Sequence, residues 1–303
     1  MNIAPSTYYD NPKPLVSGVE TDITDRIEAI CLEFPGYGYR RVTKQLQHEG
    51  KIINHKRVLR LMRESDLLCR VRRKWVKTTD SKHSFFRYPN LIKDIIVRQI
   101  NQVWLADITY IRIRRGFVYL AGILDAYSRR VVGYAISTGL ETSLTLEALR
   151  MAIEHRHPTP GCIHHSDQGV QYASVEYVEE LRGHGFRISM ARRGNPYDNA
   201  TMESFFKTLK YEEIYLFDYE TITDVQVRLP YFIEEVYNRK RLHSALGYLS
   251  PVNFEQPELG VTYRTLLTSY VQPQECICSN RNKGGNIDYR RKWTTRNTEK
   301  NFG

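Results

Sequence analysis

The apolar residues between positions 22 and 68 recur at the spacing of amphipathic helices. They fall into three short runs, separated by a Gly-Tyr-Gly break at residues 36–38 and by a polar segment that ends at Asn54. Asn54 is of a residue type that caps helix N-termini. The residues 22–68 are therefore predicted to form a small helical domain. Its predicted inward-facing residues are Ile23, Ile27, Ile30, Cys31, Phe34, Val42, Leu46, Val58, Leu61 and Met62.

From residue 101 the pattern changes to that of a β-sheet. Three β-rich runs joined by short turns predict an antiparallel meander, and helical and strand patterns then alternate up to residue 241. Pro230 falls inside the last helical pattern and is expected to kink or interrupt it. The order of these elements predicts an α/β fold for residues 101–256, in which helices cover a mixed sheet.

Three segments lack a clear periodic pattern. Residues 1–21 form an N-terminal segment, and residues 69–100 form a basic linker in which cations alternate with Trp75, either to follow phosphates or simply as a polar connection. The tail, residues 257–303, is predicted to be poorly ordered.

The chain of 303 residues has a net charge of +10 and an isoelectric point near 9.3. This balance favours nucleic acid as a partner, with a merely solvated basic surface as the alternative. The five cysteines do not have the spacing of a four-ligand zinc site. We expect neither a signal peptide nor a membrane span, and hence a cytoplasmic protein.

The second and third predicted helices flank a tight turn and carry exposed cations. This arrangement is typical of a helix-turn-helix DNA-binding domain. The alternative is a helical hairpin whose basic face is only solvated. The cations of the last helix are Lys56, Arg57, Arg60 and Arg63.

Three acidic residues of the predicted sheet domain are candidates for a site. Asp107 lies in a strand that is apolar on both faces, so its carboxylate needs a cation, an Arg partner or a proton. Asp167 ends a short strand, where α/β sheets bind ligands and where Asp also favours turns. Glu203 lies on a helix beside the predicted buried residues Met202, Phe205, Phe206 and Leu209.

Each acid taken alone has a structural explanation, such as a salt bridge for Asp107 or a surface pair with Lys207 for Glu203. Together, three acids on three elements of one domain can bind hard divalent cations through oxygen. Two Mg²⁺ ions about 3.5–4 Å apart suit phosphoryl chemistry. A phosphoryl-transfer site is thus one hypothesis for this domain.

The motifs WLADITYI, HHSDQGVQYAS, GNPYDNATMESFFKTLK and YNRKRLHSALGYLSP resemble the integrase-like DDE transposases of bacterial insertion sequences. The closest similarity is to the second reading frame of the IS-three family, and it covers residues 100–255. Thirty-five residues separate Asp167 from Glu203, a spacing shared with retroviral integrases. The segment from GYGYRRVTKQLQ to MRESDLL resembles the helical DNA-binding module that precedes this domain. The family pattern does not explain the tail, residues 257–303, which is open to being a DNA-binding extension, an arm that becomes ordered on binding, or a fortuitous continuation of the reading frame.

The resemblance implies a ribonuclease-H-like fold and a Mg²⁺-dependent enzyme that cleaves DNA and transfers strands at element ends. Asp107, Asp167 and Glu203 would be catalytic and would bind two Mg²⁺ ions, for which Mn²⁺ can substitute. Partners would be terminal-repeat and target DNA, further copies of the chain on DNA, and an upstream reading-frame product. The predicted DNA-binding residues, from the basic segments and the motifs, are Arg40, Arg41, Lys44, Lys56, Arg57, Arg60, Arg70, Arg72, Arg73, Lys74, His165, Gln168, Arg192, Arg193, Asn199, Lys207 and Lys210.

Two other functions remain open at this stage. The first is a non-catalytic DNA-binding regulator made from the same reading frame. The second is a hydrolytic nuclease of ribonuclease-H-like fold, which the helix-turn-helix domain and the spacing of the acids disfavour. His165 is equally open to a plain structural role within its strand.

Overall fold

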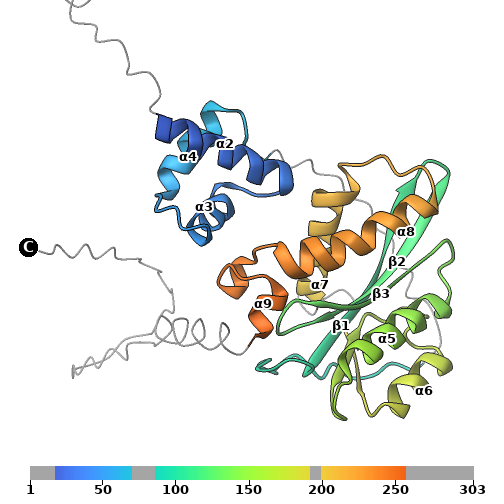
Figure 1. The fold of residues 1–303 in the computed structure, drawn as a ribbon. Helices are drawn as coiled ribbons and strands as arrows, with labels where there is room; N and C mark the ends of the chain where they lie inside the picture. Colours follow the sequence, from blue (N-terminus) through green and yellow to red (C-terminus); the bar gives the residue numbers. More distant parts are fainter. Residues whose placement is uncertain (1–17, 70–85, 192–198, 257–303) are drawn as a thin grey trace, which may run out of the picture. The chain divides into compact units, whose positions relative to one another are not determined.

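The computed structural model describes residues 18–69, 86–191 and 199–256 (Figure 1). Its first part consists of helices α2 (Gly18–Glu33), α3 (Tyr39–His48) and α4 (His55–Glu64). The predicted inward-facing residues of all three helices are buried together, except that Cys31 is half-buried. Asn54 caps α4, since its side chain accepts a hydrogen bond from the Lys56 amide. Helix α2 begins at Gly18, before the predicted start of the helical domain.

Five strands form one mixed sheet in the order β3-β2-β1-β4-β5. The predicted antiparallel meander is confirmed as β1 (Val103–Ile113), β2 (Gly116–Asp125) and β3 (Val131–Ser137). Strands β4 (Ile163–Ser166) and β5 (Arg187–Met190) continue the sheet in parallel with β1. The predicted α/β class with a mixed sheet is therefore confirmed.

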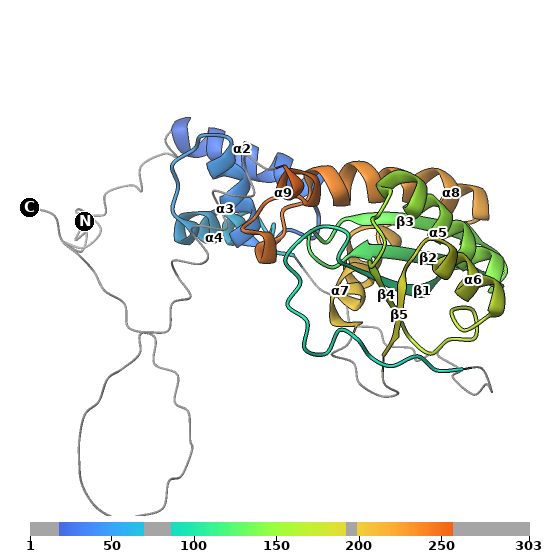
Figure 2. The same ribbon diagram turned by 90° about the horizontal axis from the view of Figure 1, so that it is seen from below.

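Both faces of the sheet are covered, because the strands are apolar on both sides (Figure 2). One face carries α5 (Thr142–Arg156) and α6 (Val175–Gly183), with Trp104 and Ala106 of β1 in their core. The other face carries α7 (Ala200–Leu209) and α8 (Ile222–Tyr231), with Val103 and Leu105 of β1 in a second core. Successive residues of β1 thus enter opposite cores, as the period of a strand requires.

The two last long helices each change their hydrogen-bonding pattern. Helix α7 continues as the π-helix η2 (Lys210–Ile214), and α8 continues as the π-helix η3 (Phe232–Lys240). The second change follows Pro230, whose missing N–H cannot serve the α-helical pattern. The α-helix is therefore interrupted near Pro230, as predicted, but the chain continues directly as a π-helix. The 3-10 turn η4 (Ser244–Leu246) and α9 (Pro251–Glu255) end the described chain.

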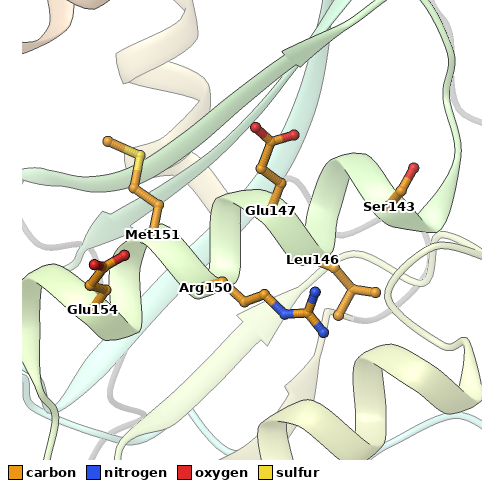
Figure 3. A pocket seen from close by; sticks show the side chains of 6 residues that line it. All are labelled: Ser143, Leu146, Glu147, Arg150, Met151 and Glu154. Atoms are coloured by element: carbon orange, nitrogen blue, oxygen red, sulfur yellow. The ribbon is translucent and has the colours of Figure 1, made fainter.

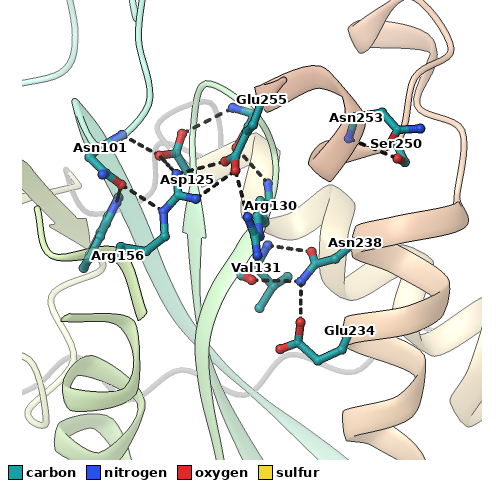
Figure 4. A network of polar contacts seen from close by, with 12 residues as sticks. Asn101, Asp125, Arg130, Val131, Arg156, Glu234, Asn238, Ser250, Asn253 and Glu255 are labelled. Atoms are coloured by element: carbon teal, nitrogen blue, oxygen red, sulfur yellow. Dashed lines mark hydrogen bonds and ion pairs between the residues drawn. The ribbon is translucent and has the colours of Figure 1, made fainter. Parts of the chain in front are cut away.

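Two features, one apolar and one polar, attach outlying segments to the sheet. Residues 86–100 belong to the predicted basic linker, yet Leu91, Ile92, Ile95 and Val97 pack on the sheet core, so this half is docked rather than free. Arg156 of α5 joins Asp125 at the end of β2 to Glu255 of α9 (Figure 4). None of the helices within the described residues combines the length and apolar character needed to span a lipid bilayer.

Candidate active site

Asp107 and Asp167 come from strands that are distant in sequence and adjacent in space. The parallel register pairs Trp104 with His164 and Leu105 with His165. Continued by two residues, the same register sets Asp107 of β1 opposite Asp167, which follows the last residue of β4. Neighbouring strands lie about 4.8 Å apart. The sheet therefore brings these two carboxylates to one point on its edge.

Helix α7 brings Glu203 to the same region of the sheet. Asp107 is paired with Gly122 of β2, and a Cβ atom built at Gly122 would lie 2.9 Å from Met202 Cε. The absence of a side chain at Gly122 thus lets α7 pack closely over the strand pair. Met202 is fully buried there, so Glu203, the next residue, is held on the exposed side of the helix near Asp107.

Amide groups fix the orientation of the two aspartates. The backbone N–H of Ile108 donates to Asp107 Oδ1 at 2.8 Å, and Asn199 Nδ2 donates to Asp107 Oδ2 at 3.3 Å. The backbone N–H of Gly169 donates to Asp167 Oδ1 at 2.8 Å. Both carboxylates are therefore held in place by groups of their own neighbourhood, and Asn199, at the start of α7, links that helix to β1.

The electrostatics show that the three acids influence one another. Burial, together with the charges of Asp167 and Glu203, raises the pKa of Asp107 from its ordinary value of 3.8 to about 7. Lys210 has the opposite effect on Asp107 but does not cancel it. Like charges within a few ångströms disfavour further ionisation. The site therefore has an excess of negative charge that a bound cation would neutralise.

Among the residues that the structure describes, no three His, Cys, Asp or Glu side chains lie close enough to hold a metal ion as they stand. The match to a divalent cation rests on the donor chemistry and the charge. Carboxylate oxygens are the ligands that Mg²⁺ prefers, and the Glu203 side chain is exposed on the first turn of α7. The donor set therefore suits a hard cation once Glu203 approaches the aspartates.

The basic and polar residues around the acids differ in their burial and in their contacts. Lys210 is half-buried, with its Nζ 4.9 Å from the centre of the Tyr110 ring, and burial lowers its pKa. Lys207 is exposed on α7. Gln168 Nε2 donates to the Ala191 carbonyl oxygen at 3.0 Å, which ties the segment after β4 to the end of β5.

His165 lies inside the sheet instead of on the surface. It is fully buried, with Nδ1 2.8 Å from Ser189 Oγ of β5. The neighbouring His164 has Nε2 2.9 Å from the Tyr177 hydroxyl, and burial lowers its pKa to about 3. Strand β4 lies between β1 and β5 and is covered by helices on both faces, so its side chains are buried. His165 therefore supports the sheet beside Asp167, and its buried ring is not accessible to DNA.

Of the six predicted DNA-binding residues in the helical part, four are exposed, and two, Arg41 and Lys44, are half-buried. Lys56 and Arg40 are exposed, whereas Arg60 forms ion pairs with Glu20 and Glu64. Arg57 NH2 lies 3.8 Å from Glu20, and Arg41 NH1 lies 3.8 Å from Glu212, where burial lowers the Arg41 pKa. Lys44 is half-buried over the Tyr248 ring. The predicted residues that lie outside the described ranges are Arg70, Arg72, Arg73, Lys74, Arg192 and Arg193.

Two residues of the site, Gly122 and Tyr110, were not among those predicted from the sequence. Gly122 has a detectable signal, because a glycine inside a strand often marks a close approach of another element. Tyr110 has none, because its contact with Lys210 depends on how α7 crosses the sheet. A hollow along one side of α5 contains none of the candidate residues; it is lined by Ser143, Leu146, Glu147, Arg150, Met151 and Glu154 (Figure 3).

The chain combines a mixed five-stranded sheet, covered by helices on both faces, with a part made of three helices before it. The integrase core domain family matches residues 97–196 and 184–251, and the HTH-like domain family matches residues 19–75. The chain belongs to the insertion-sequence transposases with an integrase core domain, of the IS-three family.

The similarity to known transposases spans most of the chain. This chain is 41% identical over 247 residues to the transposase for insertion sequence element IS904 of Lactococcus lactis, and the alignment covers 80% of this chain and 98% of that protein. It is 37% identical over 224 residues to the transposase InsF for insertion sequence IS3A of Escherichia coli, covering 74% and 78%. The HTLV-2 integrase catalytic core domain in complex with magnesium aligns with 52% of this chain and 97% of its own, at 13% identity and a TM-score of 0.41.

Proposed function

We propose that this transposase catalyses divalent-cation-dependent cleavage and strand transfer at the ends of its insertion sequence, with Asp107, Asp167 and Glu203 as the catalytic carboxylates. The proposal is supported by the register of β1 with β4, which leads Asp107 and Asp167 toward one point, and by the packing of Met202 at Gly122, which brings the neighbouring Glu203 to the same region. The raised pKa of Asp107 agrees with this arrangement. Three coupled carboxylates on β1, after β4 and on α7 are difficult to explain as structural ion pairs. Nothing in this arrangement requires a covalent intermediate on the protein.

The same three residues would hold the metal, as two Mg²⁺ ions or Mn²⁺ in their place. Bound there, the ions would activate the attacking oxygen and stabilise the departing one. In strand transfer a DNA 3′-hydroxyl oxygen forms the new bond to phosphorus, its proton leaves, and the old bond to the 3′ oxygen breaks. The neutralised carboxylates would then lose the mutual repulsion that raises the Asp107 pKa.

The remaining residues of the site position these groups. Asn199 and the amides of Ile108 and Gly169 fix the carboxylate orientations, so that little reorganisation is needed on binding. Lys210 and the exposed Lys207 would attract the DNA phosphates at the opening of the site. Gln168 would hold the segment after β4 near Asp167 through its bond to Ala191.

The helical part would provide DNA recognition, mainly through the exposed residues Lys56 and Arg40. Arg57 and Arg60 would contribute after exchanging their carboxylate partners for phosphates. DNA is the proposed partner, both as element ends and as target, with several copies of the chain acting on it and an upstream reading-frame product as a further candidate. Association with the nucleoid would follow from this DNA binding.

The decisive assay incubates the purified chain with a plasmid that carries the cognate element ends, with and without Mg²⁺. We expect nicked and joined products only with Mg²⁺, and none from Glu203→Gln at unchanged DNA affinity. Glu154→Gln is the matched control, since Glu154 is an exposed acid of α5, on the other face of the sheet from Glu203. Binding without nicking or joining, even after addition of the upstream product, would instead identify a regulator. Cleavage without joining would identify a nuclease.

A further inference from the structure

The hairpin of β1 and β2 extends past the rest of the sheet. Strand β4 pairs with β1 only as far as Leu105, and β3 pairs with β2 only from Tyr119. The hairpin end between these limits has no further strand partner within the described chain. It carries exposed Arg112 and Arg115. Asp107 lies on the same strand, so the end of the hairpin is a direct extension of the proposed active site.

Aromatic side chains gather where this hairpin meets the end of α7. The Tyr110 ring is 5.5 Å from the Phe117 ring, at an interplanar angle of 84°. Lys210 Nζ lies 4.9 Å from the centre of the Tyr110 ring, and Tyr211 is 5.5 Å from Tyr215 at 86°. Lys210 directly precedes Tyr211 in η2, so its contact with Tyr110 joins the two pairs. We call these five residues the aromatic ledge.

The two halves of the aromatic ledge are fixed relative to each other. The backbone N–H of Arg114, in the hairpin turn, donates to the Tyr219 carbonyl oxygen at 3.0 Å. Its side chain also pairs with Glu220, with NH1 3.3 Å from Oε1. The hairpin is therefore anchored to the segment between η2 and α8, which makes the ledge a preformed surface.

The aromatic ledge exposes rings that protein cores normally bury. Phe117 is 48% exposed and Tyr215 is 49% exposed. The Lys210 ammonium group occupies a face of Tyr110, so the open rings are those of Phe117 and Tyr215. Exposed aromatic rings interleaved with cations are the surface on which proteins stack the bases of single-stranded nucleic acid. A protein partner would find the same rings, but the surrounding Arg112, Arg115 and Lys210 favour a polyanion.

We propose that the aromatic ledge binds an unpaired nucleotide of the DNA, with its base stacked on Phe117 or Tyr215 and its phosphate beside Lys210. Lys210 contacts the Tyr110 ring, and its charge also acts on Asp107, so Lys210 connects the ledge with the proposed site. The ledge would therefore hold a nucleotide that lies within a few positions of the reacting phosphate. The proposal rests on the proposed function for its place in the reaction, and the binding itself does not require catalysis.

The test measures binding of fluorescent oligothymidylate and of a duplex of equal length to the full chain in EDTA. The variant is Phe117→Leu with Tyr215→Leu, and the matched control is Tyr231→Leu, an exposed aromatic residue of α8. We expect the double variant to bind oligothymidylate roughly 5- to 150-fold more weakly, the range for loss of base stacking. Its affinity for the duplex and its circular dichroism should not change.

Photo-crosslinking of the unmodified chain with 5-iododeoxyuridine oligonucleotides gives a second measurement that does not depend on the folding of any variant. We expect crosslinked peptides that contain Phe117 or Tyr215. Crosslinks found only outside the ledge, or a folded double variant with unchanged affinity for oligothymidylate, would overturn the proposal. Loss of self-association in place of DNA binding would also overturn it and assign the ledge to a protein contact. Since no metal is present, a failure of cleavage in the plasmid assay leaves these outcomes unaffected.

Discussion

Replacement of Arg156 by Met tests the polar network that joins α5, β2 and α9 (Figure 4). Arg156 donates two hydrogen bonds to Glu255, at 2.8 and 2.9 Å, and one to Asn101 Oδ1 at 3.1 Å. Its NH2 also lies 3.8 Å from Asp125 Oδ2, and Asp125 is completely buried. The substitution keeps an apolar side chain of similar length but leaves two acids with one fewer cation.

The expected loss of stability follows from the groups that remain. Removing one partner of a buried ion pair costs about 3–5 kcal/mol. Asp125 keeps the amide donors of Asn101, Tyr127 and Ser128, and Glu255 keeps Arg130 at 2.9 Å. We therefore expect the lower end, about 3 kcal/mol, which corresponds to roughly 5 °C in melting temperature for a chain of this size.

The cost should also depend on pH. Burial raises the pKa of Asp125 to about 6, and its charged form is the one that Arg156 stabilises. Burial would raise the pKa of Glu255 too, but hydrogen bonds from Arg156, Ser128 and Arg130 hold it below its ordinary value. Both acids lose their charge as the pH falls through these pKa values. The penalty of Arg156→Met should therefore be full well above pH 6 and should shrink as the pH falls through about 6, where Asp125 takes up its proton, while the part that depends on Glu255 should persist to lower pH.

The assay is urea unfolding followed by circular dichroism at pH 8 and at pH 5. Arg150→Met is the matched control, because Arg150 lies on the same helix and its ion pair with Glu180 is on the surface. We expect no measurable effect of the control at either pH. If Arg156→Met costs no more than the control, or costs the same at both pH values, the reasoning about this network is wrong.

The remaining predictions concern the site, the helical part and the packing of the sheet. Asp107→Asn should abolish stabilisation by Mg²⁺, which in the unmodified chain should reach about 2.7 kcal/mol at a hundredfold excess over Kd; an equal thermal shift in both proteins would remove Asp107 from the metal site. Lys56→Ala should reduce the slope of log K against log salt for DNA binding by about 0.9, and Arg60→Ala by less, because Arg60 is engaged with acids; equal slopes for the variants and the unmodified chain would place the contacts elsewhere. Gly133→Ala would set a Cβ 2.3 Å from a backbone oxygen of α5 and should destabilise the fold by about 1–3 kcal/mol, whereas Gly183→Ala on α6 meets open space and should stabilise it by about 0.4–1 kcal/mol; urea unfolding of both variants checks the contrast.

Local patterns in the sequence determined the elements of this protein. The apolar stripes of α3, α4 and α7 are buried as predicted, because a helix places every third or fourth residue on one side regardless of what covers it. The three strands of the meander follow from runs of β-branched and aromatic residues between short turns. The strand pattern also identified Asp107 as a candidate, since a carboxylate inside an apolar strand needs a cation, an Arg partner or a proton.

Only the tertiary structure decided which distant residues meet. The parallel register of β1 with β4 sets Asp107 opposite Asp167, and no local pattern specifies the pairing partner of a strand. The pairing of β4 with β5 buries His165 against Ser189, although its position beside Asp167 suggested a contact with DNA. Likewise, Arg41 lies beside Glu212, far along the chain, and not on a free basic face. In each case the environment of a side chain depends on how different elements pack together, and the spacing of residues within one element does not specify that packing.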